Sequence, residues 1–467
     1  MTDLDTLNVT QRAAYDAIAA GRSIFLTGPG GTGKSYLLKL LNDELPKSNG
    51  KTIALTALTG CAALLLHPKA KTLHSWAGIG LGRDSVPLLV SAIRKNRRAA
   101  LRWLTTDILV IDEVSMMTPE LFEKLDQVGR QIRRCEVRPF GGLQLVLVGD
   151  FFQLPPIVRS EEPVEMKFLF ESPLWRICGL TTFDLTEIVR QRDPVFQAVL
   201  NEARKGEVSK KSLKILAKRM GLDWSSQEIK PTMLFTRRAQ VDDINMSHLR
   251  KLTTERRIFK ATTIFLPTAN TQGFTESHPM VQKGVAKADN DAPYSPELTL
   301  AIGAQVMLLK NMQDLGLVNG SRGVVTGYTS VVKDPKQTEA QKASEQPVVN
   351  KEIQVPVVKF RCGLQIPIEH ATWELPDLPG VLRRQIPLRL AYAITVHKAQ
   401  GATLDCALID VGSKTFEFGQ AYVALSRVRD LDSLFIHDLE KTAFRAHPKV
   451  AAFYAATPSS SPANAPS

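Results

Sequence analysis

An α/β fold with parallel sheets, divided into two lobes, is predicted by three observations on this sequence. Short runs rich in β-branched residues alternate with helical patterns in the first third of the chain. A similar alternation starts near Thr182 and, after an interruption, continues almost to the end. The length of 467 residues exceeds that of one domain, and 44 % hydrophobic residues suffice for full-sized cores. Strands that alternate with helices are joined by crossover connections, so they pair in parallel.

The first third of the chain supplies the elements of the first predicted sheet. Pro46 is expected to end one helix, and Pro119 suits the first turn of the next, where its missing N–H is no loss. In parallel sheets, the loops at the carboxyl ends of the strands carry the chemistry. The expected strands are residues 23–27, 52–56, 108–112 and 144–148, and the expected helices are residues 35–45 and 119–134.

The second α/β pattern is interrupted by a segment with a different character. Its α/β elements are expected at residues 231–235, 239–249, 388–395, 407–410, 416–425 and 433–436. The interruption holds strands joined by turns that contain Gly and Asp, expected at residues 301–309, 322–328, 353–360 and 364–368. The domains predicted are a first lobe (1–181), a second lobe (182–296 and 386–445), a small inserted β-barrel (297–385) with a mobile loop (334–351), and a disordered tail (458–467).

The charge balance favours a polyanionic partner. Lys and Arg number 59 against 47 Asp and Glu, a formal net charge of +12, and nucleic acid is the commonest polyanion. A generally basic soluble protein is the alternative. The five cysteines form no CxxC pair, which argues against a disulfide framework. No secretory signal and no run of eighteen apolar residues is visible, so we expect a cytoplasmic protein without a membrane span.

A phosphate-binding loop follows the first strand. The run Gly28-Pro29-Gly30-Gly31-Thr32-Gly33-Lys34-Ser35 matches G-x-x-x-x-G-K-[ST] in full, between a predicted strand and a predicted helix. Backbone N–H groups of such a loop cradle phosphate oxygens, and the helix amino terminus adds positive potential. Lys34 is expected to pair with the β- and γ-phosphates of ATP, Ser35 to bind Mg²⁺, and Tyr36 to complete the nucleotide site.

Two acidic residues end the apolar strand at 108–112. Asp112 is expected to hold Mg²⁺, and Glu113 to act as the general base that polarises the attacking water. Asp-Glu pairs are also common on protein surfaces, but a position at a strand end downstream of a phosphate-binding loop favours catalysis.

Further motifs follow in a fixed order along the chain. They lie at residues 56–63 (TALTGCAA), 72–75 (TLHS), 145–156 (LVLVGDFFQLPP), 393–401 (AITVHKAQG) and 421–429 (AYVALSRVR). This set resembles superfamily 1 helicases, and the run Phe140 to Gln144 leading into Gly149 is similar to the Pif (petite integration frequency) family. One departure is Arg237 after Thr236, where that family often has Asn, so no DNA role is carried over to it. The short amino terminus suggests a minimal bacterial or viral form; a eukaryotic one would be nuclear or mitochondrial.

The resemblance implies two RecA-like lobes with ATP bound in the cleft between them. Arg190 and Arg427 lie in matched motifs and are the candidate arginine fingers, which would stabilise charge on the transferred phosphoryl group. Gln153 would sense the γ-phosphate, while at least one of the preceding Phe151 and Phe152 is expected in the core. Gln400 and Gly401 suit a turn that approaches phosphate.

Gln11 resembles the family's adenine-reading glutamine. It lies in an amphipathic helix that Thr10 is expected to cap, and a plain helix cap is the alternative role for this segment.

Single-stranded DNA and DNA junctions are the partners that the resemblance implies. The contact candidates are Thr59, Gly60, His74, Ser75, His397 and Lys398, whose hydroxyl, backbone N–H and cationic groups suit phosphate. Both histidines have the alternative of an ordinary hydrogen-bonded core position. A strand-separating wedge is expected at about residues 76–103, which hold five cations between Arg94 and Arg102. A solvated helix face is the alternative for that charge run.

Two classes of function fit these patterns. The leading hypothesis is an ATP-dependent helicase and translocase, monomeric in solution, for which the resemblance implies 5′-to-3′ travel on duplex, forked or G-quadruplex DNA. The alternative is a nucleotide-gated DNA clamp that hydrolyses ATP too slowly to move. The presence of Lys34 and Glu113 together with Arg190 and Arg427 argues against a clamp, because a clamp could dispense with the base and the fingers.

Overall fold

Two compact units make up the chain. The computed structural model describes residues 3–67, 70–80, 82–156, 168–224, 230–235, 238–292, 294–312, 315–317, 319–331, 353–375, 378, 380–413, 415 and 417–457. Unit 1 consists of Met1–Gly221 and Ile409–Ser467, and unit 2 of Leu222–Leu408. The predicted loop at 334–351 and the predicted tail at 458–467 lie outside the described residues. The lobe, wedge and barrel boundaries stay predictions.

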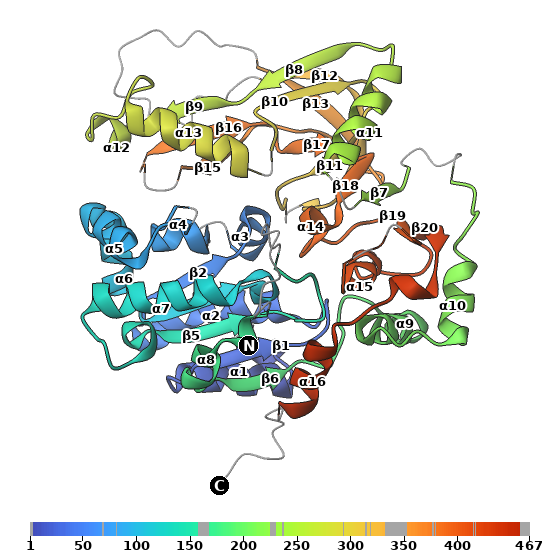
Figure 1. Ribbon diagram of the computed structural model, residues 1–467. Helices are drawn as coiled ribbons and strands as arrows, with labels where there is room; N and C mark the ends of the chain where they lie inside the picture. The colour runs from blue at the N-terminus through green and yellow to red at the C-terminus, as the bar shows by residue number, and fades with distance from the viewer. Residues whose placement is uncertain are drawn as a thin grey trace. The chain divides into compact units, whose positions relative to one another are not determined.

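A parallel sheet forms the centre of unit 1, which confirms the predicted α/β class (Figure 1). Its strand order is β3-β2-β4-β5-β1-β6. Strands β1 and β2 follow each other in the sequence but are separated in the sheet by β4 and β5, so crossover connections join the strands. The bounds are β1 (Ile24–Thr27), β2 (Ile53–Ala57), β3 (Lys71–Thr72), β4 (Ile108–Asp112), β5 (Gln144–Val148) and β6 (Thr181–Asp184).

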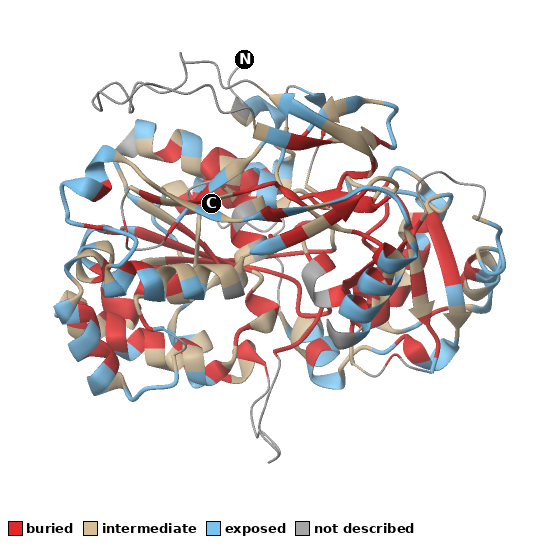
Figure 2. Cartoon of the chain, turned by 90° about the horizontal axis from the view of Figure 1, so that it is seen from above, coloured by how far each residue is buried: buried red, intermediate tan, exposed pale blue. Residues whose placement is uncertain are grey.

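Both faces of this sheet are covered by apolar clusters. Successive side chains of a strand point to opposite faces, so one strand contributes to both clusters. In β1, Ile24 and Leu26 belong to one apolar cluster, whereas Phe25 belongs to another. The first cluster contains side chains of α1 and α2, and the second contains side chains of α5, α6 and α7. Figure 2 shows that buried residues follow the strands while exposed residues lie on the outer faces of the helices.

The helices of unit 1 begin at side-chain caps or prolines in most cases. Thr118 accepts from the backbone N–H of Leu121, and Pro119 follows at the first helical position, as predicted. The bounds are α1 (Val9–Ala19), α2 (Lys34–Asn49), α3 (Gly60–Leu66), α4 (Leu73–Ala77), α5 (Val86–Lys95), α6 (Arg97–Thr105), α7 (Pro119–Arg133), α8 (Pro173–Ile177), α9 (Pro194–Lys205), α10 (Lys210–Ala217), α15 (Gln420–Leu425) and α16 (Pro448–Ala456).

The prediction that Pro46 ends a helix is wrong. Helix α2 continues through Pro46 to Asn49, and the following Gly50 has φ 69° and donates its N–H to the carbonyl oxygen of Pro46 at 3.0 Å. A proline removes one helical N–H, but the leucines of α2 that are buried against the sheet retain the helix. The left-handed Gly50 then supplies the C-terminal cap.

Unit 2 combines a short parallel pairing with antiparallel sheets. Strand β18 pairs in parallel with β7, which is followed by α11, as predicted for an α/β element. The antiparallel sheets have the orders β14-β13-β12-β11-β17, β15-β16-β9 and β10-β8. The predicted strand at 388–395 is divided into β17 and β18. Closure of the antiparallel strands into a barrel stays a prediction.

The bounds in unit 2 are as follows. The strands are β7 (Thr232–Phe235), β8 (Arg256–Lys260), β9 (Thr262–Phe265), β10 (Glu297–Ala301), β11 (Gln305–Leu308), β12 (Arg322–Val331), β13 (Ile353–Phe360), β14 (Gln365–Pro367), β15 (Ala371–Glu374), β16 (Val381–Gln385), β17 (Leu388–Leu390) and β18 (Ala393–Thr395). The helices are α11 (Arg238–Lys251), α12 (Pro267–Asn270), α13 (Pro279–Asp291) and α14 (Val396–Ala399). Strand β19 (Ala407–Val411) crosses between the units, and β20 (Leu434–Leu439) lies in unit 1.

Among the described helices, none combines the length and the apolar character needed to cross a lipid bilayer.

Candidate nucleotide site

The glycine-rich loop connects β1 to α2, where the sequence predicted it. Gly28, Gly31 and Gly33 have φ values of 131°, 88° and 86°. A Cβ at residue 28 would lie 2.3 Å from the carbonyl oxygen of Leu185, so the loop has no room for a side chain there. Glycine is therefore required by both conformation and packing. A loop of this kind turns its backbone N–H groups inward, which suits phosphate oxygens.

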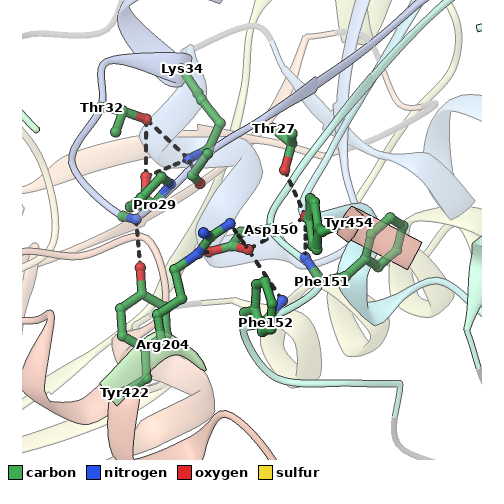
Figure 3. Close-up of polar contacts among 12 residues, drawn as sticks. Thr27, Pro29, Thr32, Lys34, Asp150, Phe151, Phe152, Arg204, Tyr422 and Tyr454 are labelled. Atoms are coloured by element: carbon green, nitrogen blue, oxygen red, sulfur yellow. Dashed lines mark hydrogen bonds and ion pairs between the residues drawn. The ribbon is translucent and has the colours of Figure 1, made fainter. Parts of the chain in front are cut away.

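The ammonium group of Lys34 lies on this loop (Figure 3). It donates to the carbonyl oxygens of Gly28 at 2.7 Å and Pro29 at 2.8 Å, and Thr32 Oγ1 donates to the same Pro29 oxygen at 3.0 Å. Burial lowers the pKa of Lys34, against the opposing effect of the negative charge on Asp150. An anionic phosphate at the loop would therefore stabilise the charged form of this lysine.

The two predicted acidic residues lie at the end of β4. Asp112 is 8 % exposed, and its Oδ1 accepts a hydrogen bond from the backbone N–H of Glu113 at 2.8 Å. Burial, followed by the charge of Glu113, raises the pKa of Asp112 to about 7. Glu113 has φ 59° and ψ 40°, the left-handed region that non-glycine residues rarely adopt. Such strain at a predicted base is typical of functional sites.

The residues present fit Mg²⁺. Ser35 is exposed at the start of α2, and Asp112 is a buried carboxylate whose raised pKa a nearby cation would oppose. Hydroxyl and carboxylate oxygens are the ligands that this hard cation prefers.

Arg190, one predicted finger, lies directly against the loop. The backbone N–H groups of Val189 and Arg190 both donate to the carbonyl oxygen of Gly31, at 2.9 and 3.1 Å. A Cβ at residue 31 would lie 2.5 Å from the Cβ of Arg190. Burial lowers the pKa of Arg190, and Glu113 is close enough to oppose this shift.

Arg427, the other predicted finger, is buried beside the same loop. Its Nε donates to the carbonyl oxygen of Val423 at 2.7 Å and its Nη2 to Ser426 Oγ at 2.6 Å. A Cβ at Gly30 would lie 3.6 Å from Nη2. Burial, reinforced by the charge of Arg190, lowers the pKa of Arg427 to about 10. The structure thus brings Lys34, Arg190 and Arg427 together at the loop within unit 1, and the charge of Glu113 acts on all three.

Two further residues join the loop to the segments that carry the fingers. Gln191 Nε2 donates to the carbonyl oxygens of Ser426 at 3.3 Å and Val428 at 2.9 Å. The backbone N–H of Gly30 donates to the hydroxyl of Tyr422 at 2.8 Å, and burial raises the pKa of this phenol to about 12. Both lie beside residues predicted from motifs, but no local pattern indicated that their side chains contact the loop or each other's segments.

The segment after β5 is built around a buried ion pair that sequence reasoning missed. Arg204 of α9 donates to both carboxylate oxygens of Asp150 at 2.9 Å, and its guanidinium lies 4.6 Å from the ring centre of Phe152. Asp150 is 0 % exposed and Arg204 8 %. The charge of Asp150 outweighs burial and raises the pKa of Arg204. Phe151 and Phe152 are both buried, which confirms a core position for them.

Gln153, the predicted γ-phosphate sensor, is buried in the same turn. Its backbone N–H donates to the carbonyl oxygen of Asp150 at 2.9 Å. A Cβ at Gly419 would lie 2.7 Å from the carbonyl oxygen of Gln153, so the segment before α15 packs tightly on this turn.

Gln11 contacts the loop, but the predicted cap is wrong. Asn8 rather than Thr10 caps α1, because Asn8 Oδ1 accepts from the N–H of Gln11 at 2.8 Å. Gln11 Oε1 accepts from the N–H of Asn8, and its Nε2 donates to the carbonyl oxygen of Thr32 at 3.3 Å. Gln11 is therefore both a cap and a loop contact. Tyr36 is exposed, and its hydroxyl is hydrogen bonded to Thr6 at 2.6 Å.

The DNA-contact candidates of unit 1 lie at the starts of two short helices. Thr59 caps α3 by accepting from the N–H of Ala62 at 3.2 Å, and Gly60 is the first residue of that helix. His74 and Ser75 lie in α4, where Ser75 is buried and its Oγ has no hydrogen-bond partner within the described residues.

The remaining DNA and phosphate candidates belong to unit 2. Gln400 is buried and Gly401 has φ 79°. The side chains of His397 and Lys398, and the departure at Arg237, lie outside the described residues. The DNA roles of all these residues stay predictions.

The predicted wedge is helical, and its cations differ in their surroundings. Arg94 and Arg97 are exposed. Arg102 instead donates to the carbonyl oxygens of Trp76 at 2.7 Å and Ser75 at 2.9 Å, at the end of α4. Part of the charge run is therefore structural.

Comparison with known proteins identifies the family. A family model described as PIF1-like helicase matches residues 6–221, and one described as DNA helicase Pif1, 2B domain, matches residues 290–328. The human ATP-dependent DNA helicase PIF1 is 38 % identical over 454 residues, which cover 96 % of this chain and 63 % of the human protein. The chain thus spans less than two thirds of that curated relative.

Solved structures agree over the whole fold. Pif1 helicase from Candida albicans is 34 % identical with a TM-score of 0.75, and the match covers 96 % of this chain and 99 % of that one. Pif1 from Bacteroides in complex with ADP-AlF4 is 28 % identical with a TM-score of 0.74, and the match covers 96 % of both chains. These likenesses, together with the shared motifs, show that the chain belongs to the PIF1-like helicase family.

Proposed function

We propose that the chain is an ATP-dependent DNA helicase and single-stranded DNA translocase. The observation that carries this proposal is the convergence of Lys34, Arg190 and Arg427 on one glycine-rich loop, with the charge of Glu113 acting on all three. A lysine, a base and two arginines around a phosphate loop are the parts needed to hydrolyse a nucleoside triphosphate in cycles. The relatives support the choice of substrate, since solved Pif1 structures contain ADP-AlF4 and single-stranded DNA.

Each residue of the site would have a different role in ATP hydrolysis. Lys34 binds the β- and γ-phosphates once it exchanges loop carbonyl oxygens for phosphate oxygens, and Glu113 takes the proton of the attacking water. Arg190 and Arg427 stabilise the charge on the transferred group. Ser35 and Asp112 would hold Mg²⁺, which neutralises phosphate charge when bound. Gln11 would recognise adenine and Gln153 the γ-phosphate.

The nucleic-acid part of the proposal rests on charge and on family resemblance. The net charge of +12 favours a phosphate backbone, and Thr59, Gly60, His74, Ser75, His397 and Lys398 are the proposed contacts. Travel in the 5′-to-3′ direction, forked and G-quadruplex substrates, action as a monomer and a cytoplasmic location are proposed with it. One Pif1 structure concerns unwinding at forked duplex DNA by two coordinating helicases, so a fork is the first substrate to test.

The ATP hydrolysis rate with and without single-stranded DNA tests the proposal. We expect strong stimulation by DNA, loss of turnover with retained ATP binding in Glu113→Gln, and wild-type turnover in the matched control Glu120→Gln. Glu120 is an exposed partner of Lys124, and such pairs contribute little. Turnover that DNA does not stimulate would favour the nucleotide-gated clamp.

A strand-displacement assay tests direction and unwinding. Duplexes with a 5′ tail or a 3′ tail of equal length are offered with ATP, and we expect displacement from the 5′-tailed substrate. Preference for the 3′ tail would refute the proposed direction, and DNA-stimulated hydrolysis without displacement would limit the function to translocation.

A further inference from the structure

The C-terminal helix α16 places a tyrosine hydroxyl between two strand ends of the nucleotide site. The hydroxyl of Tyr454 is hydrogen bonded to Thr27 Oγ1 at 2.7 Å and accepts from the backbone N–H of Phe151 at 3.1 Å (Figure 3). Thr27 is the last residue of β1 and directly precedes the phosphate loop. Phe151 belongs to the turn after β5 that carries Gln153. One hydroxyl therefore joins the two segments that lead into the loop and into the predicted γ-phosphate sensor.

Tyr454 also contacts the buried ion pair of that turn. Its hydroxyl lies 3.5 Å from Asp150 Oδ1, its ring stacks on Phe152 with centres 5.0 Å apart and planes 10° apart, and the guanidinium of Arg204 lies 5.4 Å from its ring centre. The negative charge of Asp150 in turn favours the charged form of Lys34 by opposing the fall in its pKa. The tyrosine therefore contacts the carboxylate whose negative charge acts on the lysine of the loop.

Helix α16 is anchored independently of this hydroxyl. The neighbouring Phe453 stacks on Phe170 with ring centres 4.3 Å apart and meets Phe151 edge to face at 5.5 Å. Lys449 forms an ion pair with Glu171, and Val450 is buried. Removing one phenolic oxygen leaves all of these contacts in place, so the effect of the hydroxyl is separable from the attachment of the helix.

We infer that Tyr454 is a positioning residue of the nucleotide site, whose hydroxyl holds the Asp150–Gln153 turn in register with the start of the phosphate loop. This inference rests on the proposed ATPase function. The distance between the loop and the γ-phosphate sensor must be held within a fraction of an ångström for catalysis, and a shared hydroxyl with two partners fixes it. Tyr454 touches no reacting atom, so its effect is on turnover through the residues that it orients.

Tyr454→Phe tests the inference because it deletes the hydroxyl and keeps the ring. We expect kcat for DNA-stimulated ATP hydrolysis to fall about ten-fold, the size expected for one lost hydrogen-bonding group in a preorganised site. The KM for ATP should change less than three-fold and the thermal midpoint by no more than about 3 °C, since stacking remains. A purely structural tyrosine would lower the midpoint and leave kcat of the folded enzyme unchanged, and this result would overturn the inference.

A double-mutant cycle with Thr27→Val sharpens the test. If the two hydroxyls act through their mutual hydrogen bond, the double variant loses no more turnover than the more affected single variant. Multiplicative losses would show independent roles and would contradict the proposed link. Thr27→Ser retains the hydroxyl and should restore near wild-type turnover.

Matched controls separate this inference from the proposed function. Tyr328→Phe removes a comparable hydroxyl, which donates to the carbonyl oxygen of Leu300 at 3.0 Å, and should leave kcat unchanged. Phe453→Leu should lower the thermal midpoint while kcat of the folded fraction remains near wild type.

Wild-type protein without DNA-stimulated hydrolysis would refute the proposed function itself. An active wild type with a fully active Tyr454→Phe would refute only the role of Tyr454.

Discussion

Cations that are wholly or partly buried occur in two regions of unit 1, and the two regions affect their charged forms in opposite ways. Arg204 lies against Asp150 with two hydrogen bonds of 2.9 Å, and the carboxylate raises its pKa. Lys34, Arg190 and Arg427, here called the phosphate-site cations, surround the glycine-rich loop, and burial lowers the pKa of each. One region thus holds a charge that the fold neutralises, whereas the other holds charges that the fold destabilises.

This difference in environment distinguishes a residue that stabilises the fold from residues that bind the substrate. A buried ion pair with good geometry is expected in a folded core, where loss of one partner is costly. Cations whose charged form is disfavoured gain most from an anion that arrives later, which is the behaviour required for binding a triphosphate. Substitutions should therefore lower turnover at the phosphate-site cations and lower stability at Arg204.

The largest effect is expected for Lys34→Ala. Loss of the ammonium removes the cation closest to the loop backbone, so ATP hydrolysis should fall to background. The thermal midpoint should stay the same or rise, because the folded state no longer holds this charge in a partly buried position. Turnover assays and thermal unfolding measure the two effects. Vigorous hydrolysis by the variant would contradict the assigned site.

Arg427→Ala should reduce turnover by roughly 10³-fold, the loss typical of an arginine finger. Arg427→Lys should also be strongly impaired, because an ammonium lacks the planar fork of the guanidinium. Steady-state ATPase assays at saturating DNA measure the loss, with Arg176→Ala as the control at an exposed arginine of α8. Equal, mild losses in Arg427→Ala and Arg176→Ala would place Arg427 outside the reaction.

Arg204→Ala should act mainly on stability. Breaking a buried ion pair leaves Asp150 charged and buried, at a cost of about 3–5 kcal/mol in the free energy of unfolding. Urea denaturation measures this change, and Lys34→Ala serves as the comparison in the same assay. If Arg204→Ala unfolds at the wild-type urea concentration, the contrast between the two regions fails.

The smallest expected difference is between Gly31→Ala and Gly21→Ala, two substitutions at glycines with similar φ values and different neighbours. Both glycines have left-handed φ values, 88° and 85°, so alanine should cost each about 1–2 kcal/mol in stability. A Cβ at residue 31 meets the Cβ of Arg190 at 2.5 Å, whereas a Cβ at residue 21 meets only Lys51 Nζ at 3.9 Å. Turnover should fall at least ten-fold in Gly31→Ala alone, since only there must a finger move. Equal ATPase rates would show that the finger's position against the loop is not critical.

Local patterns predicted the elements of unit 1 well and their ends less well. The strands β4 and β5 have the predicted bounds, because an uninterrupted apolar run followed by Asp or Gly defines a buried strand. Pro46 and Thr10 were misjudged, because a proline inside a helix can be outweighed by packing, and a cap depends on which side chain reaches the free N–H groups.

The sequence alone indicated the phosphate loop and the acid pair, since each depends on residue types at short, fixed spacing, and resemblance to family motifs indicated both candidate fingers. Tertiary structure decided what surrounds them. The pairing of Asp150 with Arg204, the contact of Gly30 with Tyr422, and the link from Thr27 to Tyr454 join residues 54, 392 and 427 positions apart. Folding rather than spacing brings such partners together, so no local pattern contains them.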